Sequence, residues 1–143
     1  MKLDANRILV PVNGKPYSER TFRWACQIAR ESKTELHAVH VIEVPLALSL
    51  EAEISEDINI GEAVLARIEA IASEEKYKGL QARFLRARQA GPAVVAESEN
   101  KFMDLLIMGI PYNHRFGECS VGSTASYILN NASCQIMLNR ERA

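Results

Sequence analysis

The chain has 143 residues, of which 48% are hydrophobic and 24% are charged, and its formal net charge is −1. This length and balance predict one globular domain over residues 1–143 and exclude a chain that is disordered over most of its length. Basic residues are spread along the sequence, which argues against a protein dedicated to binding nucleic acid, because such proteins concentrate positive charge.

The segments that would direct the chain to a membrane or out of the cell are missing from this sequence. No apolar run approaches the roughly 20 residues of a membrane span, and the opening MKLDANRILV lacks the layout of a signal peptide. The three cysteines, Cys26, Cys119 and Cys134, form no CxxC pair, so we expect reduced thiols in a cytoplasmic protein. Apolar neighbours predict that Cys26 and Cys134 are buried.

The first predicted strand covers residues 8–12, is rich in β-branched side chains and ends at the turn pair Asn13-Gly14. Asn13 therefore follows a strand at the edge where open α/β sheets bind ligands. It either contacts a ligand there or only forms the turn. Apolar residues at helical spacing then predict a helix over residues 18–33, with Ser18 as its N-cap.

A second strand is predicted over residues 36–44. Its two histidines, His37 and His40, are three positions apart and lie on opposite faces of an extended strand, which argues against a shared metal site. Residues 46–53 are expected to form either a loop or a short helix. The next helix begins at Ser55, followed by acidic residues in its first turn.

The second half of the chain continues the alternation of strands and helices. A third strand is predicted over residues 80–88, a third helix from Gly91-Pro92, a fourth strand over 104–108, a fourth helix over 123–129 and a fifth strand over 134–138. The third strand carries a basic cluster of Arg83, Arg86 and Arg88. This cluster either faces a phosphate or forms a solvated strand end. Five strands alternating with four helices predict an α/β fold with an open parallel sheet and helices on both faces.

The segment between the fourth strand and the fourth helix carries the clearest functional signal. It begins at Gly109 and closes at Gly122-Ser123-Thr124, directly before a helix. A helix N-terminus opened by Gly-Ser presents free backbone N–H groups to an anion, usually a phosphate. The sequence contains no GxxxxGK[ST], no GxGxxG after the first strand and no GxSxG. The usual P-loop, dinucleotide and nucleophile-elbow sites are therefore not expected, nor is a metal cluster among the few His and Cys residues.

This segment resembles the universal stress protein family, whose nucleotide-binding members carry a G-x2-G-x9-G-[S/T] loop after the fourth strand. Gly109 matches the first glycine, Tyr112 stands in place of the second, and Gly122 and Ser123 are in register. The stretches ILVPVNG, SERTFRWACQIA and LHAVHVIEV extend the resemblance over nearly the whole chain. The resemblance implies an adenine nucleotide alpha hydrolase-like sheet of order 3-2-1-4-5, with the nucleotide across the carboxyl ends of the first, second and fourth strands.

The resemblance also implies a ligand, ATP or AMP with or without magnesium, and residues that would hold it. Adenine or ribose would lie near Pro11, Val12 and Asn13, and the base would lie between Val41 and Met108. Ribose and phosphates would meet Gly109, Gly122, Ser123 and the following Thr124, where N–H groups and a hydroxyl can bind an anion.

Two positions depart from the family pattern. Asn13 replaces a usual aspartate, so a hydrogen bond from a ribose hydroxyl would lack charge assistance. Tyr112 brings a ring where the family has a glycine. Its ring could stack on the ligand or its hydroxyl could bind a phosphate, with Arg115 pairing the negative charge. Alternatively, Tyr112, Arg115 and Phe116 only anchor a loop that binds nothing.

Three functions follow from these observations. The first is a regulatory module that binds an adenine nucleotide without efficient catalysis. The second is a stress or interaction protein of the same fold that binds no nucleotide and works as a homodimer through the apolar last strand, including Cys134, Ile136 and Leu138. The third, slow ATP hydrolysis, lacks an obvious general base, because Glu118 and His114 are near the proposed phosphates only in sequence.

Overall fold

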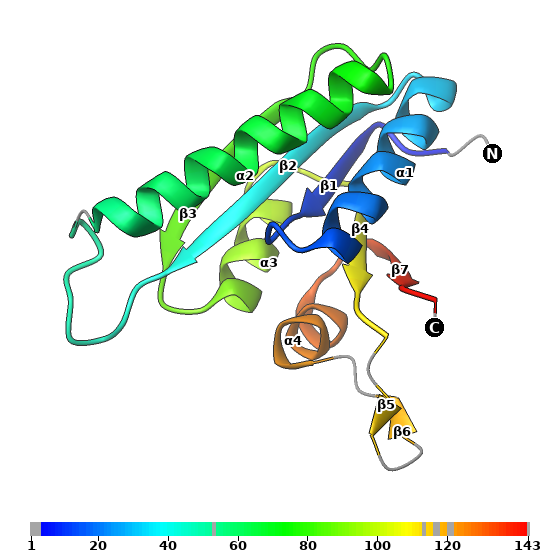
Figure 1. Cartoon of the computed structure of the whole chain (residues 1–143). Coiled ribbons are helices and arrows are strands. Elements are labelled where there is room, and N and C mark those ends of the chain that lie inside the picture. Colours follow the sequence, from blue (N-terminus) through cyan, green and yellow to red (C-terminus); the bar gives the residue numbers. More distant parts are fainter. Residues whose placement is uncertain (1–3, 53, 113, 116–117, 120–121, 143) are drawn as a thin grey trace.

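A computed structural model of the chain describes residues 4–52, 54–112, 114–115, 118–119 and 122–142, with 114, 115, 118 and 119 described by their backbone alone. Five parallel strands form one sheet in the order β3-β2-β1-β4-β7 (Figure 1). Their bounds are β1 Arg7–Pro11, β2 Glu35–Glu43, β3 Gln81–Ala87, β4 Leu105–Ile110 and β7 Gln135–Arg140. Counted along the chain within this sheet, the order is 3-2-1-4-5, which confirms the predicted fold class.

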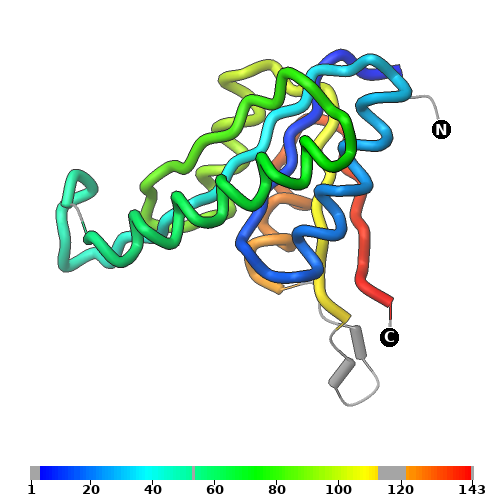
Figure 2. Tube along the Cα trace, turned by 45° about the horizontal axis from the view of Figure 1, so that its top comes forward, coloured from blue at the N-terminus to red at the C-terminus, as the bar shows by residue number. Residues whose placement is uncertain are grey.

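Four helices cover the two faces of the sheet. They are α1 Pro16–Ser32, α2 Ser55–Glu74, α3 Ala90–Asn100 and α4 Ser123–Asn131. α1 and α2 lie together on one face, in front of the strands in Figure 2, and α3 and α4 lie on the other. The chain therefore changes faces between β1 and β4, the two neighbouring strands whose connections run in opposite directions.

The inner strand β4 is buried on both sides because apolar residues occupy both faces of its pleat. Leu105 and Ile107 pack with the core under α1 and α2, whereas Leu106 and Met108 pack with the core under α3 and α4. All four side chains are at most 4% exposed. A continuous apolar run of this kind is what a parallel strand with helices on both faces requires.

Two local features differ from the sequence expectations, and a third decides between two alternatives. α1 begins at Pro16 after Lys15 rather than at Ser18, because the fixed φ of proline suits the first helical position. Residues 46–52 form turns and no helix, which supports the loop alternative for the described part of that segment. The segment after β4, expected to be a loop throughout, contains a short antiparallel pair, β5 His114–Arg115 and β6 Glu118–Cys119, which projects beyond α4 (Figure 1).

The basic cluster of Arg83, Arg86 and Arg88 is exposed, as the solvated alternative expects, and two of its members also have protein partners. Arg83 forms two hydrogen bonds, of 2.9 and 2.5 Å, with the carboxylate of Glu97 on α3, which raise the pKa of the Arg83 guanidinium. Arg88 donates hydrogen bonds of 2.7 Å to the carbonyl oxygens of Pro45 and Leu48. Both side chains therefore tie β3 to neighbouring segments.

The cysteine and histidine side chains that the structure describes are at least partly buried or contact other residues of the protein. Cys26 is fully buried, as expected, and burial raises the pKa of its thiol to about 12, whereas Cys134 is only partly buried. The side chain of Cys119 lies outside the described residues. His40 is buried and its Nδ1–H donates to the carbonyl oxygen of Val12, whereas His37 Nε2 contacts Glu35. Over the described ranges, no group of three or more His, Cys, Asp or Glu residues could hold a metal ion.

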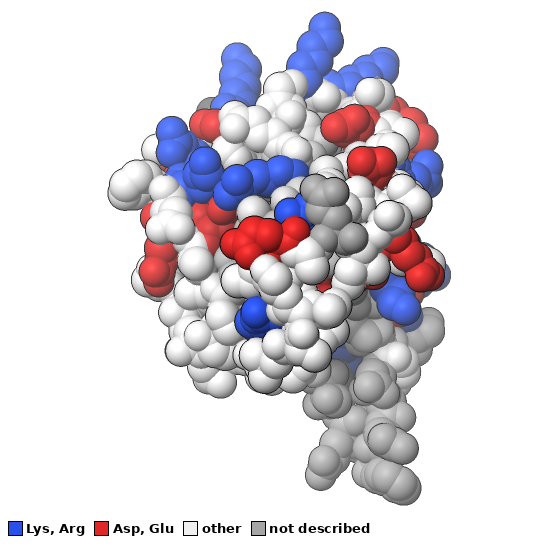
Figure 3. All heavy atoms as spheres, turned by 90° about the vertical axis from the view of Figure 1, so that its left-hand side faces the viewer, with Lys and Arg blue, Asp and Glu red and all other residues white. Residues whose placement is uncertain are grey.

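The surface carries charges of both signs. On the face shown in Figure 3, Lys and Arg side chains alternate with Asp and Glu over the upper part, and charged groups are sparse over the lower part. Within the described part of the chain, no helix combines the length and apolar character needed to cross a membrane.

Candidate functional site

A cavity of about 400 Å³ opens at the carboxyl ends of β1, β2 and β4, on the α3–α4 side of the sheet. It lies at the change of faces between β1 and β4, where open α/β sheets bind their ligands. Nine of the eleven residues predicted to form a site line it: Pro11, Val12, Asn13, Val41, Met108, Gly109, Gly122, Ser123 and Thr124. The structure therefore brings together residues that are spread over more than a hundred positions of the sequence.

One wall of the cavity is apolar. Val39 and Val41 of β2, Val94 of α3 and Met108 of β4 contribute to it, and Val39, Val94 and Met108 are almost completely buried. These side chains belong to the core on that side of the sheet or pack against it, so their positions are set by packing. Such a wall can hold a flat, uncharged ring, as in most small-molecule sites.

The N-terminus of α4 also borders the cavity. Its N-cap is Gly122, with φ of 82°, and no side chain of the described residues caps this end. The first N–H groups of a helix have no acceptor within the helix, so those of Ser123 and Thr124 can meet a ligand in the cavity. Among the described residues, nothing lies within 4 Å of where a Cβ on Gly122 would stand, so this part of the chain leaves the space at the helix end open.

Asn13 both forms the turn after β1 and borders the cavity. Its Oδ1 accepts a hydrogen bond of 2.9 Å from the N–H of Lys15, and its Nδ2 donates one of 2.7 Å to the hydroxyl of Tyr17. Its own N–H donates to Ser18 Oγ at 3.2 Å. The amide retains one N–H and one lone pair for a ligand, so the two sequence alternatives for Asn13 are compatible.

Two glycines near the cavity are required by close packing. A Cβ on Gly109 would collide with the side chain of Thr21 on α1 and would lie 3.3 Å from the carbonyl oxygen of Tyr17. A Cβ on Gly91 would lie 2.9 Å from Cβ of Tyr127, so Gly91 lets α3 approach α4 closely. Close packing against α1 therefore requires a glycine at position 109, a reason that the family pattern did not indicate.

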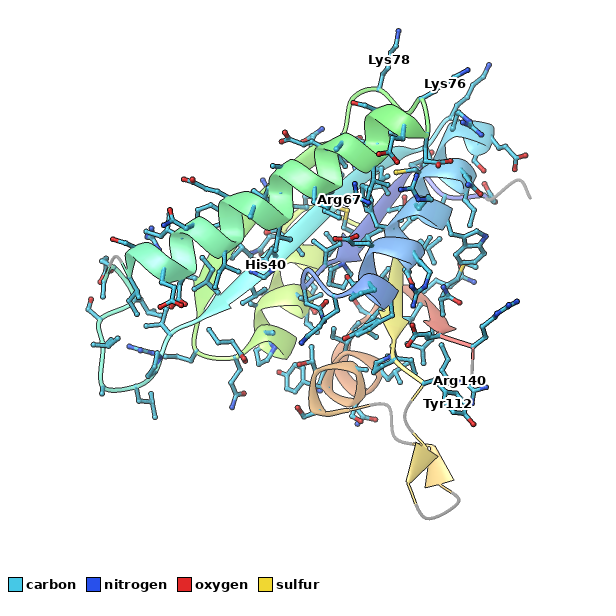
Figure 4. All side chains as sticks on the ribbon, in the orientation of Figure 1. His40, Arg67, Lys76, Lys78, Tyr112 and Arg140 are labelled. Atoms are coloured by element: carbon cyan, nitrogen blue, oxygen red, sulfur yellow. The ribbon has the colours of Figure 1, made fainter. Side chains whose placement is uncertain are left out.

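Tyr112 does not line the cavity, although the sequence placed it among the site residues. The guanidinium carbon of Arg140 lies 5.1 Å from the centroid of its ring, and Figure 4 shows the two side chains together. The N–H of Tyr112 also donates to Glu141 at 3.4 Å. The geometry thus supports the anchoring alternative for Tyr112 at the start of the segment, outside the lining of the cavity. The side chain of Arg115 and all of Phe116 lie outside the described residues.

Several polar groups that line the cavity were not predicted from the sequence. Glu43 is the last residue of β2, and its Oε2 accepts a hydrogen bond of 2.9 Å from the N–H of Ala90, the first residue of α3. Tyr17, Ser18 and His40 also line the cavity. The position of Glu43 could have been found, because it follows Val41 by two residues and strand side chains alternate between faces.

Comparison with known proteins agrees with the resemblance. Residues 5–140 match the model of the universal stress protein family. The chain is also 26% identical over 138 residues to a universal stress protein of Methanocaldococcus jannaschii, a match that covers 92% of this chain and 80% of that protein.

Solved structures show the same fold at lower identity. A universal stress protein from Archaeoglobus fulgidus in complex with dAMP has a TM-score of 0.74 at 20% identity, over 93% of this chain and 96% of that chain. One from Arabidopsis thaliana with AMP bound has a TM-score of 0.70 at 16% identity, over 96% and 93%. A universal stress protein in complex with cAMP has a TM-score of 0.71 at 16% identity, over 94% and 96%. Because the family model spans nearly all of the sequence, this chain belongs to the universal stress protein family.

Proposed function

We propose that this chain is a regulatory module that binds an adenine nucleotide, ATP or AMP, in the cavity at the carboxyl edge of the sheet, without efficient catalysis. The observation that carries the proposal is the pairing of an apolar wall with an uncapped helix N-terminus in one cavity of about 400 Å³. Relatives of the same fold crystallised with AMP, dAMP or cAMP support it.

The chain's own residues fit such a ligand. Val41 and Met108 would hold the base by apolar contact, and Pro11, Val12 and Asn13 would lie against the base or ribose. The N–H groups of residues 123 and 124 and the Ser123 hydroxyl would take a phosphate, because the positive end of the helix dipole favours an anion there. A magnesium ion, if bound, would depend on the phosphates, since the described residues offer no cluster of ligands for it.

We propose that catalysis is not efficient because the acid–base groups of the cavity wall are already hydrogen-bonded within the protein. Glu43 accepts a hydrogen bond from the start of α3, and His40 Nδ1 donates to a backbone carbonyl. Each group thus has a structural hydrogen bond, and efficient hydrolysis would need a base positioned on a water molecule. The free thiols of Cys26 and Cys134 support the proposed cytoplasmic location, and the mixed surface charge supports the proposal that the chain has no nucleic-acid partner.

We expect saturable binding of a fluorescent ATP analogue, which AMP and ATP displace, and we expect Ser123→Ala combined with Gly122→Val to abolish it. Valine at 122 must adopt the left-handed φ of 82° and would place its side chain in the open space before α4, whereas alanine at 123 removes the hydroxyl. Fluorescence titration of both proteins measures the loss.

The matched control is Gly79→Val combined with Ser73→Ala. Gly79 has a φ of 90° and open space around its Cβ position, but it does not line the cavity, so this variant shares the backbone strain without the blockage. Absence of saturable binding by the unmodified chain at millimolar nucleotide would contradict the proposed function.

A second function is favoured by the edge of the sheet. β7 is paired only with β4 among the described strands, and Leu138 is 38% exposed, next to the partly buried Cys134 and Ile136. An unpaired apolar edge can be covered by a second copy of the strand. We infer that the chain works as a homodimer through β7, with or without nucleotide.

We expect Ile136→Lys to dissociate the dimer, so that the mass measured by light scattering over a range of concentrations falls toward that of the monomer. Because Ile136 also packs against the core, the more exposed Leu138→Lys is the companion variant, and circular dichroism checks that both remain folded. Ile60→Lys, at a side chain that is 51% exposed on α2, which packs on β2 and β3 toward the other edge of the sheet, is the control for added charge. An unmodified chain that is monomeric at every concentration would refute this function.

A further inference from the structure

Glu43 gives the cavity a fixed negative charge. It ends β2 on the same face as Val39 and Val41 and lines the cavity with them. Its carboxylate is held in place, because Oε2 accepts the hydrogen bond from the N–H of Ala90. One oxygen atom of the carboxylate is therefore engaged with the protein, and the charge stays at the wall.

Two helix N-termini border the cavity, and they differ in what satisfies them. The first N–H group of α3 is bonded to Glu43, whereas α4 has no capping side chain among the described residues. The absence of a side chain at Gly91 lets α3 lie close to Tyr127 of α4. The N-terminus of α4 can thus accept an anionic ligand, whereas the N-terminus of α3 is already bonded to the carboxylate of Glu43.

The lining residues that the structure describes include no Lys or Arg to offset this charge. Glu43 and the start of α4 line the same cavity of about 400 Å³, and at an ionic strength of about 0.01 M the Debye length of about 30 Å leaves charges within such a space largely unscreened by salt. Each further phosphate of a ligand bound at α4 brings more negative charge into this field. Repulsion from Glu43 therefore grows with the number of phosphates.

On the basis of the proposed function, we propose that Glu43 is a specificity-determining residue that makes the cavity select a nucleoside monophosphate over the triphosphate. The hydrogen bond to Ala90 fixes the position of the charge, and the single free helix end suits one phosphate group. The expected preference for AMP over ATP, measured without divalent cations, is about tenfold at low ionic strength.

The test is calorimetric titration of the full chain with AMP and with ATP, comparing it with Glu43→Gln. Glutamine keeps an oxygen that can accept the hydrogen bond from Ala90 but removes the charge. The preference should fall to about twofold or less, chiefly because ATP binds more tightly. Glu69→Gln, on the exposed face of α2 outside the cavity, changes the net charge equally and should leave the preference intact.

Each outcome has a distinct meaning. If the unmodified chain binds ATP at least as tightly as AMP, or if Glu43→Gln leaves the preference unchanged, the role of Glu43 is refuted while the proposed function stands. If neither nucleotide binds at millimolar concentration, the proposed function itself fails. Should Glu43→Gln unfold, salt gives the second measurement: raising it from about 0.01 M to 1 M shortens the Debye length from about 30 to 3 Å, and a preference that does not shrink refutes the role of Glu43.

Discussion

Replacing Gly109 with alanine is expected to lower the free energy of unfolding by about 2–3 kcal/mol, as overpacking of a close contact does. The added Cβ would collide with the Thr21 side chain, with Cβ of Thr21 at 3.0 Å, and would press on the carbonyl oxygen of Tyr17. Thr21 is 1% exposed and its Oγ1 accepts a hydrogen bond of 3.0 Å from Asn139 Nδ2. It therefore cannot turn aside without leaving a buried polar group unpaired.

Urea unfolding of Gly109→Ala measures this cost, and a double-mutant cycle with Thr21→Ala locates it. Removing Oγ1 of Thr21 relieves the closest part of the collision, so the double variant should be more stable than the sum of the single effects by about 1 kcal/mol. A change within about 0.5 kcal/mol for Gly109→Ala, the usual range of a surface substitution, would show that β4 and α1 are not packed as described.

Arg83→Met is expected to lower the free energy of unfolding by about 2 kcal/mol. Glu97 is only 7% exposed, and without Arg83 its carboxylate would remain in α3 with both hydrogen bonds lost. Loss of one partner of a fully buried pair costs about 3–5 kcal/mol, and the smaller value expected here reflects the Arg83 side chain, which is 52% exposed and lets water approach.

The double variant Arg83→Met/Glu97→Met should recover most of the lost stability, because it leaves no unpaired charge. Arg67→Met is the matched control: Arg67 lies on α2 (Figure 4) and pairs at 3.3 Å with Glu19 at the surface, so its loss should cost less than about 1 kcal/mol. Thermal unfolding compares the four proteins. Equal losses of stability in Arg83→Met and Arg67→Met would contradict this prediction, because they would mean that the burial of Glu97 does not increase the cost of losing its partner.

The fold could be predicted because its signals are local. Residues 104–108 are apolar on both faces, which marks a central parallel strand, and the regular alternation of strands and helices sets the class. The glycine spacing of the last third then located the helix end that borders the cavity. These patterns depend on neighbouring residues and on the periods of strands and helices, which the sequence displays directly.

The features that could not be predicted from the sequence depend on contacts between residues that are distant along the chain. Glu43 caps a helix that begins 47 positions later, and Arg83 meets Glu97 across 14 positions, so neither pairing has a local signature. The family pattern identified the position of Tyr112 but not the direction of its ring, which is determined by Arg140 at the end of β7. The predicted N-cap of α1, Ser18, was wrong because Pro16 begins the helix two residues earlier, after Lys15.

The bond between Asn139 and Thr21 has a consequence for how the two proposed activities relate. Asn139 lies opposite Gly109 in the register of β7 and β4, and Thr21 touches both. A nucleotide that displaced Gly109 would thus disturb the strand through which two copies would pair. By thermodynamic linkage, self-association would then alter nucleotide affinity by the same factor as nucleotide alters self-association.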